Sequence, residues 1–150
     1  MREAEKKLEA RSKQVMSILE AELASEKSAQ GGPKAARRAV HLLVRMGRST
    51  RACDLFLKLR SNILNAALRS VKLDGATVAY VQRLTAVFFN SVLEAGVEFR
   101  KAFSLVTSKP EVGGGMTNGH ARTNGSPGEM AKFSSLLLWL RTEIDNFSDR

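Results

Sequence analysis

The chain is poor in the residues that form disulfides, break helices or span membranes. Cys53 is the single cysteine among its 150 residues, so no internal disulfide forms and the fold depends on packing, as is usual in a reducing compartment. None of its three prolines lies between residues 34 and 107, which permits long helices. The longest apolar run, Leu136 to Leu140, is far shorter than the roughly 20 residues that cross a bilayer. We therefore expect a cytoplasmic, all-α protein.

Residues that carry catalysis are also scarce. The two histidines, His41 and His120, lie far apart in the sequence, and Cys53 has no second cysteine to form a metal-binding pair. The cluster Gly113-Gly114-Gly115 lacks the Lys and the Ser or Thr that complete a phosphate-binding loop. The sequence therefore predicts a protein that is not an enzyme, with no catalytic, cofactor-binding or metal-binding residues and no small-molecule substrate. Cys53 is expected to be a small buried hydrophobe.

The sequence is rich in apolar residues at helical spacing, with 43% hydrophobic residues in all. A charged helix is predicted over residues 2–29, within an N-terminal segment 1–30, and Gly31-Gly32-Pro33 ends it. Three amphipathic helices are predicted in a bundle core that spans residues 31–107. These helices are expected at residues 34–46, 51–73 and about 78–105.

The remainder of the chain divides into a loop and a last helix. Residues 108–128 are rich in Gly and Asn and carry few apolar side chains, so they cannot repay the entropy of ordering and are predicted to be a disordered loop. Residues 129–150 regain a helical apolar stripe that is still running at Arg150, so we expect the native bundle to continue beyond it. The fold class is all-α, with long amphipathic helices in a bundle or stacked helical rod.

The turns and the core can be predicted in more detail. Gly47 is expected to adopt a left-handed conformation at the end of the helix 34–46, and Ser49 or Thr50 is expected to cap the next helix. The core is expected to contain the four phenylalanines of the helix 78–105 and one face of the helix 51–73. These residues are Phe88, Phe89, Phe99 and Phe103, together with Ala52, Leu55, Phe56, Leu59, Ile63, Ala66 and Ala67.

A basic stripe is the main candidate for a binding surface. The formal net charge is +9, and Arg38, His41, Arg45 and Arg48 are spaced to follow the polar side of the predicted helix 34–46. A solvated face is the default interpretation of such a stripe. The alternatives are contacts with acidic partner helices, anionic lipid or nucleic acid, because clustered Arg binds carboxylates and phosphates. Ser126, which precedes Pro127, is a candidate phosphorylation site.

An ordered pattern of packing residues runs through the predicted helices from residue 32 to residue 103. Three of its segments are Gly32-Pro33-Lys34-Ala35-Ala36-Arg37-Arg38-Ala39-Val40, Ala52-Cys53-Asp54-Leu55-Phe56-Leu57 and Val87-Phe88-Phe89. In this pattern the chain resembles the C-terminal helical region of the exocyst component 8 family. Relatives pass more directly from the Phe103 helix to the Phe133 helix, so residues 108–128 look like an insertion.

The resemblance implies a subunit of the exocyst, the complex that tethers secretory vesicles to the plasma membrane before fusion. It implies a non-catalytic scaffold without cofactors, whose partners are the other exocyst subunits. The expected location is the cytoplasm, peripheral to the plasma membrane at sites of secretion, with indirect or peripheral membrane association.

Two other classes of protein remain as alternatives. A different helical-repeat adaptor or tethering subunit would show internal repetition, at about 34 residues for a tetratricopeptide array, and no such repeat is found. A basic module that binds nucleic acid or anionic lipid would use the Arg38 stripe. No aromatic residues accompany that stripe, which argues against single-stranded nucleic acid, so no nucleic-acid partner is expected.

Overall fold

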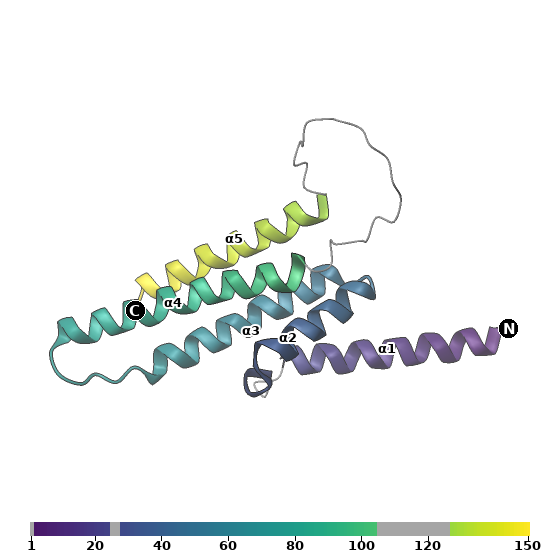
Figure 1. Cartoon of the computed structure of the whole chain (residues 1–150), viewed down its shortest axis with the longest axis horizontal. Coiled ribbons are helices and arrows are strands. Elements are labelled where there is room, and N and C mark those ends of the chain that lie inside the picture. Colours follow the sequence, from purple (N-terminus) through teal and green to yellow (C-terminus); the bar gives the residue numbers. More distant parts are fainter. Residues whose placement is uncertain (1, 25–27, 105–126) are drawn as a thin grey trace, which may run out of the picture.

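The computed structural model describes residues 2–24, 28–104 and 127–150. In these ranges the chain forms helices and no strand. The helices are α1 (Arg2–Ala24), α2 (Ser28–Arg45), α3 (Ser49–Ser70), α4 (Thr77–Ser104) and α5 (Pro127–Ser148). From α2 to α5 they alternate in direction, and the N-terminal half of α1 projects beyond the others (Figure 1). The all-α bundle predicted from the sequence is confirmed.

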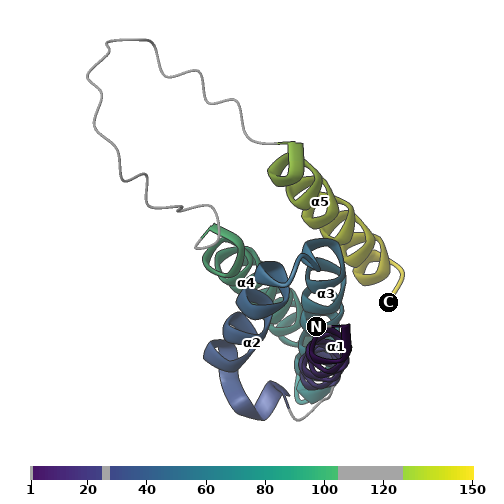
Figure 2. The ribbon, with the colours of Figure 1, turned by 90° about the vertical axis from the view of Figure 1, so that its right-hand side faces the viewer.

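α3 lies at the centre of the bundle. It packs against all four other helices, with α5 on one side of it and α1 and α2 on the other (Figure 2). A helix that is covered from several directions needs apolar residues around most of its circumference. The run Leu55-Phe56-Leu57 meets this need, because all three side chains are buried although they point in different directions.

Phenylalanine rings from α3 and α4 form the main core. The ring of Phe56 is fully buried, and its centroid lies 6.0 Å from those of both Phe99 and Phe103 in edge-on arrangements. Each such ring contributes roughly 2 kcal/mol or more through burial. A second cluster at the other end of α3 joins Leu64 and Leu68 to Phe88 of α4. The two clusters tie α4 to α3 along most of its length.

The turn from α2 to α3 is set by Gly47, as the sequence predicts. Gly47 has a positive φ of 78°, its N–H donates to the carbonyl of Val44, and the N–H of Arg48 donates to the carbonyl of Leu43. This pair of bonds is a Schellman motif, which satisfies free carbonyls at the end of α2. The predicted cap of α3 is wrong, because α3 begins at Ser49 itself and its N-cap residue, Arg48, makes no side-chain capping bond.

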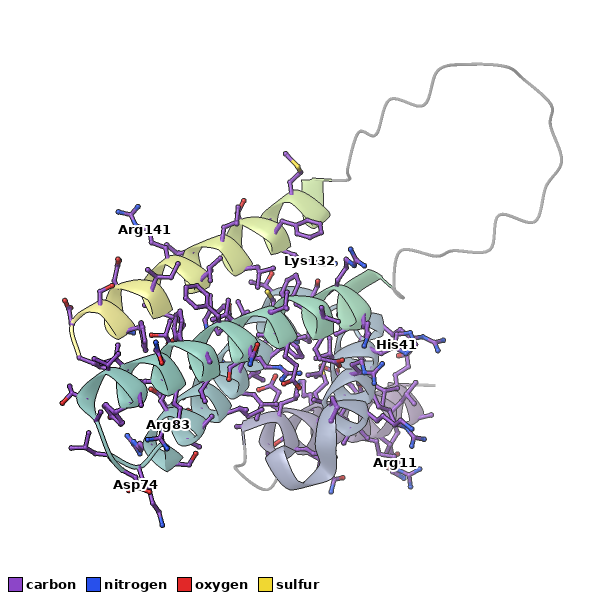
Figure 3. The ribbon with its side chains drawn as sticks, turned by 60° about the vertical axis from the view of Figure 1, so that its left-hand side comes forward. Arg11, His41, Asp74, Arg83, Lys132 and Arg141 are labelled. Carbon is purple, nitrogen blue, oxygen red and sulfur yellow. The ribbon has the colours of Figure 1, made fainter. Side chains whose placement is uncertain are left out.

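Two other glycines mark breaks in the helices. Gly75, with φ 85°, lies in the α3–α4 turn, where a guanidinium nitrogen of Arg83 donates to the carbonyl of Asp74 (Figure 3). Gly32, with φ 73°, interrupts α2. The helix predicted over residues 2–29 corresponds to α1 as far as Ala24, whereas Ser28 already belongs to α2, which runs in the opposite direction (Figure 1).

Several predicted core positions are exposed instead. Phe89 has 60% of its surface exposed, and Ala66 of α3 is exposed too, because the buried side of α3 turns from Phe56 toward Leu64 and Leu68. In α1, Leu19 and Leu23 are buried, whereas Leu8, Val15 and Ile18 lie on the surface. The loop predicted over residues 108–128 lies outside the described residues as far as residue 126, and its last two residues, Pro127 and Gly128, belong to α5 instead. The division of the chain into four segments stays a prediction.

Candidate interaction surfaces

A row of basic side chains follows the outer side of α2. We call it the α2 ridge and define it as Lys34, Arg38, His41 and Arg45. At 100° per residue these four positions fall within an arc of about 60°, and the row is about 16 Å long. The opposite side of α2 is buried in the core through Ala36, Ala39, Val40 and Leu43. The burial of that apolar side holds the ridge outward.

The structure brings together three of the four basic residues that the sequence singled out. Arg38, His41 and Arg45 share the ridge, and Figure 3 shows His41 at the edge of the molecule. Arg48 lies beyond α2, in the turn before α3. Lys34, one turn before Arg38, completes the row. Lys34 precedes Arg38 by four residues, and this helical spacing would have predicted that it belongs to the row.

The ridge borders two shallow hollows, and Lys34 and Arg38 line both of them. One hollow, of about 350 Å³, is also lined by Arg37, His41 and Ala102 of α4. The other, of about 470 Å³, lies between α1 and α2 and includes Leu19 and Glu22. Both hollows are open to solvent along the ridge, so an approaching anion meets cationic side chains before it meets the core.

Arg37, although it neighbours the ridge, has a structural partner. Its Nε lies 3.1 Å from Oε2 of Glu98 on α4, and Nζ of Lys101 lies 3.0 Å from the other oxygen of that carboxylate. Glu98 is buried, so its charge has to be compensated inside the bundle. Within the described residues, Lys34, Arg38 and Arg45 form no ion pair. Residues 27–53 of the sequence contain no acidic side chain, and the acidic side chain that borders the ridge is Glu22 of α1, in the hollow between α1 and α2.

A second surface of different chemistry lies on α4 and α5. We call it the α4–α5 apolar face and define it as Phe89, Leu93, Val97, Phe133 and Leu137. The two helices are held together by Phe88 and Phe147, whose rings stack with centroids 4.2 Å apart, and by Phe99 and Phe133 at 6.3 Å. Leu93 and Leu137 are 69% and 65% exposed, which is unusual for two neighbouring helices of a small protein.

α5 is fixed to α3 by a small polar network. The hydroxyl of Ser61 on α3 donates to the carboxylate of Glu143, and Nε1 of Trp139 donates to the same hydroxyl at 2.8 Å. Glu143 is 6% exposed, so Ser61 is a partner that its carboxylate needs. At the end of α5, a guanidinium nitrogen of Arg150 donates to Oδ1 of Asn65 at 2.7 Å. These bonds set the position of α5 and therefore that of the apolar face.

The remaining candidate residues are not brought together. Cys53 is buried, and burial, assisted by the charge of Asp54, raises the pKa of its thiol to about 11. His120 and Ser126 lie outside the described residues, and phosphorylation of Ser126 stays a prediction. Among the residues that the structure describes, no group of three or more His, Cys, Asp and Glu side chains is placed to hold a metal ion. No helix in the described part is both long enough and apolar enough to cross a membrane.

Similar proteins are exocyst subunits. Relatives named exocyst complex component 8 are 43% identical over 104 residues in Xenopus laevis and 42% identical over 149 residues in Gallus gallus, which is 69% and 99% of this chain. The relative in Homo sapiens is 42% identical over 104 residues, again 69% of the chain. The chain spans 15%, 18% and 14% of the lengths of these three relatives.

No solved structure matches the chain. The family model described as exocyst component 84 C-terminal matches residues 2–110, which include α1 to α4 and therefore both the α2 ridge and the α4 side of the apolar face. Since this match covers well over half of the sequence, the chain belongs to the exocyst component 84 C-terminal family.

Proposed function

We propose that the chain is a non-catalytic scaffold within an exocyst subunit, and that it binds other exocyst subunits through the α4–α5 apolar face. In this role it helps to dock secretory vesicles at the plasma membrane, acting from the cytoplasm at sites of secretion. The family supports the exocyst assignment. The observation that carries the mode of action is the exposure of large apolar side chains along two neighbouring helices.

The physical argument rests on burial. Full burial of a Leu or Phe side chain contributes about 1.5–3 kcal/mol. Covering the five partly exposed side chains of this face would therefore add substantially to the free energy of binding a partner. The apolar positions of α4 recur every four residues, at Phe89, Leu93 and Val97, which is the pattern that packs against another helix. A partner helix laid along α4 and α5 would cover this face and extend the bundle.

The experiment is affinity capture of the tagged chain from cell lysate at moderate salt, with co-purifying proteins identified by mass spectrometry. We expect the wild-type chain to recover other exocyst subunits, and a variant with Leu93→Asp and Leu137→Asp to recover at least tenfold less. The control variant carries Leu73→Asp and Val78→Asp, which place the same two charges at exposed apolar positions near the α3–α4 turn. Circular dichroism establishes that both variants remain folded.

The outcomes separate the two parts of the proposal. If the wild-type chain recovers exocyst subunits and both variants recover them equally, the contact lies elsewhere on the molecule. If the wild-type chain recovers no exocyst subunit, the assignment of scaffold function to this part of the protein is wrong.

A further inference from the structure

The α2 ridge has the properties of a binding surface for an extended anion. It carries Lys34, Arg38 and Arg45 without an ion-pair partner in the described residues, and His41 lies between them. A single phosphate or carboxylate would contact only two of these side chains, because the row is about 16 Å long. An anionic partner that uses the whole ridge therefore has to be extended as well.

The ridge is separate from the surface that we assign to protein partners. Figure 2 shows α2 and α5 on opposite sides of α3, so a body that covers the ridge leaves the α5 part of the apolar face open. The two surfaces also differ in chemistry, since one is cationic and the other is built from Phe and Leu side chains. They can be occupied at the same time.

The surroundings of the ridge favour a membrane over a protein. Specific protein interfaces have an apolar core, yet on α2 itself the exposed large apolar side chain beside the ridge is Leu42, with the small Ala35 as its neighbour. Attraction between an anionic leaflet and basic side chains requires no apolar core, and it contributes about 1 kcal/mol for each Lys or Arg close to the surface. The ridge lies on the outer side of a helix, where a flat surface can approach it.

We propose that the α2 ridge contacts the anionic headgroups of a membrane leaflet directly, so that α2 lies against the bilayer while α5 faces away from it. The interaction is electrostatic and peripheral, with no insertion of side chains into the hydrocarbon region. It would orient the bundle on the membrane and present the α5 side of the apolar face to other proteins. This inference does not depend on the function proposed above, because it concerns another surface and another ligand.

The test is flotation of the purified 150-residue chain with lipid vesicles of phosphatidylcholine alone or with 30% phosphatidylserine. We expect binding to the anionic vesicles only, and its loss as salt is raised toward 1 M, where the screening length falls to about 3 Å. The variant Lys34→Glu, Arg38→Glu, Arg45→Glu is expected to bind at least about 100-fold more weakly, since each cation alone contributes about fivefold.

A matched variant separates the ridge from net charge. Arg69→Glu, Lys72→Glu and Arg141→Glu also reverse three exposed cations, and Figure 3 shows Arg141 pointing away from α4. Each reversal lowers the net charge by two, so both triple variants change the formal net charge from +9 to +3. The inference requires that this variant binds within threefold of the wild type. Equal loss in both variants, binding to neutral vesicles, or no binding by the wild-type chain would overturn it.

Affinity capture from cell lysate tests the competing hypothesis that an acidic protein binds the ridge. If the ridge variant keeps its affinity for anionic vesicles but loses the exocyst subunits recovered by the wild type, the ridge binds an acidic protein and the inference is wrong. If it loses the vesicles and keeps the subunits, the membrane contact is supported. Failure of the function proposed above would leave the vesicle result unchanged.

Discussion

α3 and α5 are both 22 residues long and both carry many large apolar side chains, yet the fold uses them in opposite ways. α3 buries its apolar residues because it has neighbours on several sides. α5 packs mainly on α3, and Met130, Phe133, Leu137, Leu138 and Ile144 remain exposed. Apolar content alone therefore does not separate a core helix from one that forms an interface. The number of neighbouring helices does.

The largest effect is expected from removing one ring in α3. Phe56→Ala deletes a fully buried side chain that meets Phe99 and Phe103, so the free energy of unfolding should fall by about 3–5 kcal/mol. The matched change in α5 is Phe133→Ala, at a ring that is half exposed, and it should cost no more than about 1 kcal/mol. Urea denaturation followed by circular dichroism measures both. Equal losses would show that α5 is as firmly buried as α3.

A smaller effect is expected at the polar contact between the two helices. Ser61→Ala removes the donor to Glu143 and the acceptor for Trp139, so it leaves two polar groups unsatisfied near the α3–α5 interface. The free energy of unfolding should fall by about 1–3 kcal/mol. Ser134→Ala is the control, because the Ser134 hydroxyl bonds only to the carbonyl of Met130 in its own helix. Its unfolding free energy should stay within about 0.5 kcal/mol of the wild type. A neutral result for Ser61→Ala would mean that α5 is positioned by its rings alone.

The contrast between these helices also explains what could be predicted from the sequence. Helix periodicity and the glycines at positions 47 and 75 are local signals, and they located α3, α4 and the part of α2 that follows Gly32 to within a few residues. Which apolar residues are buried depends on neighbours distant in the sequence. Phe56 and Phe89 both lie on apolar stripes, and the sequence predicts that both are buried. Phe56 is buried, but Phe89 is exposed.

Buried charge was missed for the same reason. Arg60 is buried, with its guanidinium 5.4 Å from the centroid of the Phe56 ring and Nη1 3.6 Å from Oε1 of Glu94, and nothing in its spacing distinguishes it from an exposed arginine. The α2 ridge could be predicted in part, because Arg38, His41 and Arg45 repeat at helical spacing. That Arg37 pairs with Glu98 while Arg38 remains unpaired follows only from the packing of α4 against α2.

The reactivity of two thiols gives a direct view of the α3–α5 contact. Cys53 lines a small hollow whose other wall is formed by Gly128, Ala131, Lys132 and Ser135 of α5. Its thiol pKa is raised to about 11, mainly by burial and secondarily by the charge of Asp54, although a hydrogen bond from Ser135 opposes the shift. The thiolate is the reactive form, so the native protein should react slowly with a thiol reagent at pH 8.

The comparison thiol is Leu137→Cys in a Cys53→Ala background, which places a cysteine on the exposed side of α5. From the thiolate populations alone, Cys53 should react about 200-fold more slowly than this thiol at pH 8, and its rate should rise as the pH approaches 11. In denaturant the two should react alike. Because α5 covers Cys53, the Ser61→Ala change should accelerate the Cys53 reaction and leave that of the surface thiol unchanged. Equal native rates would mean that α5 leaves α3 so often that the α4–α5 apolar face has no fixed shape, which would remove the structural basis for a partner helix there.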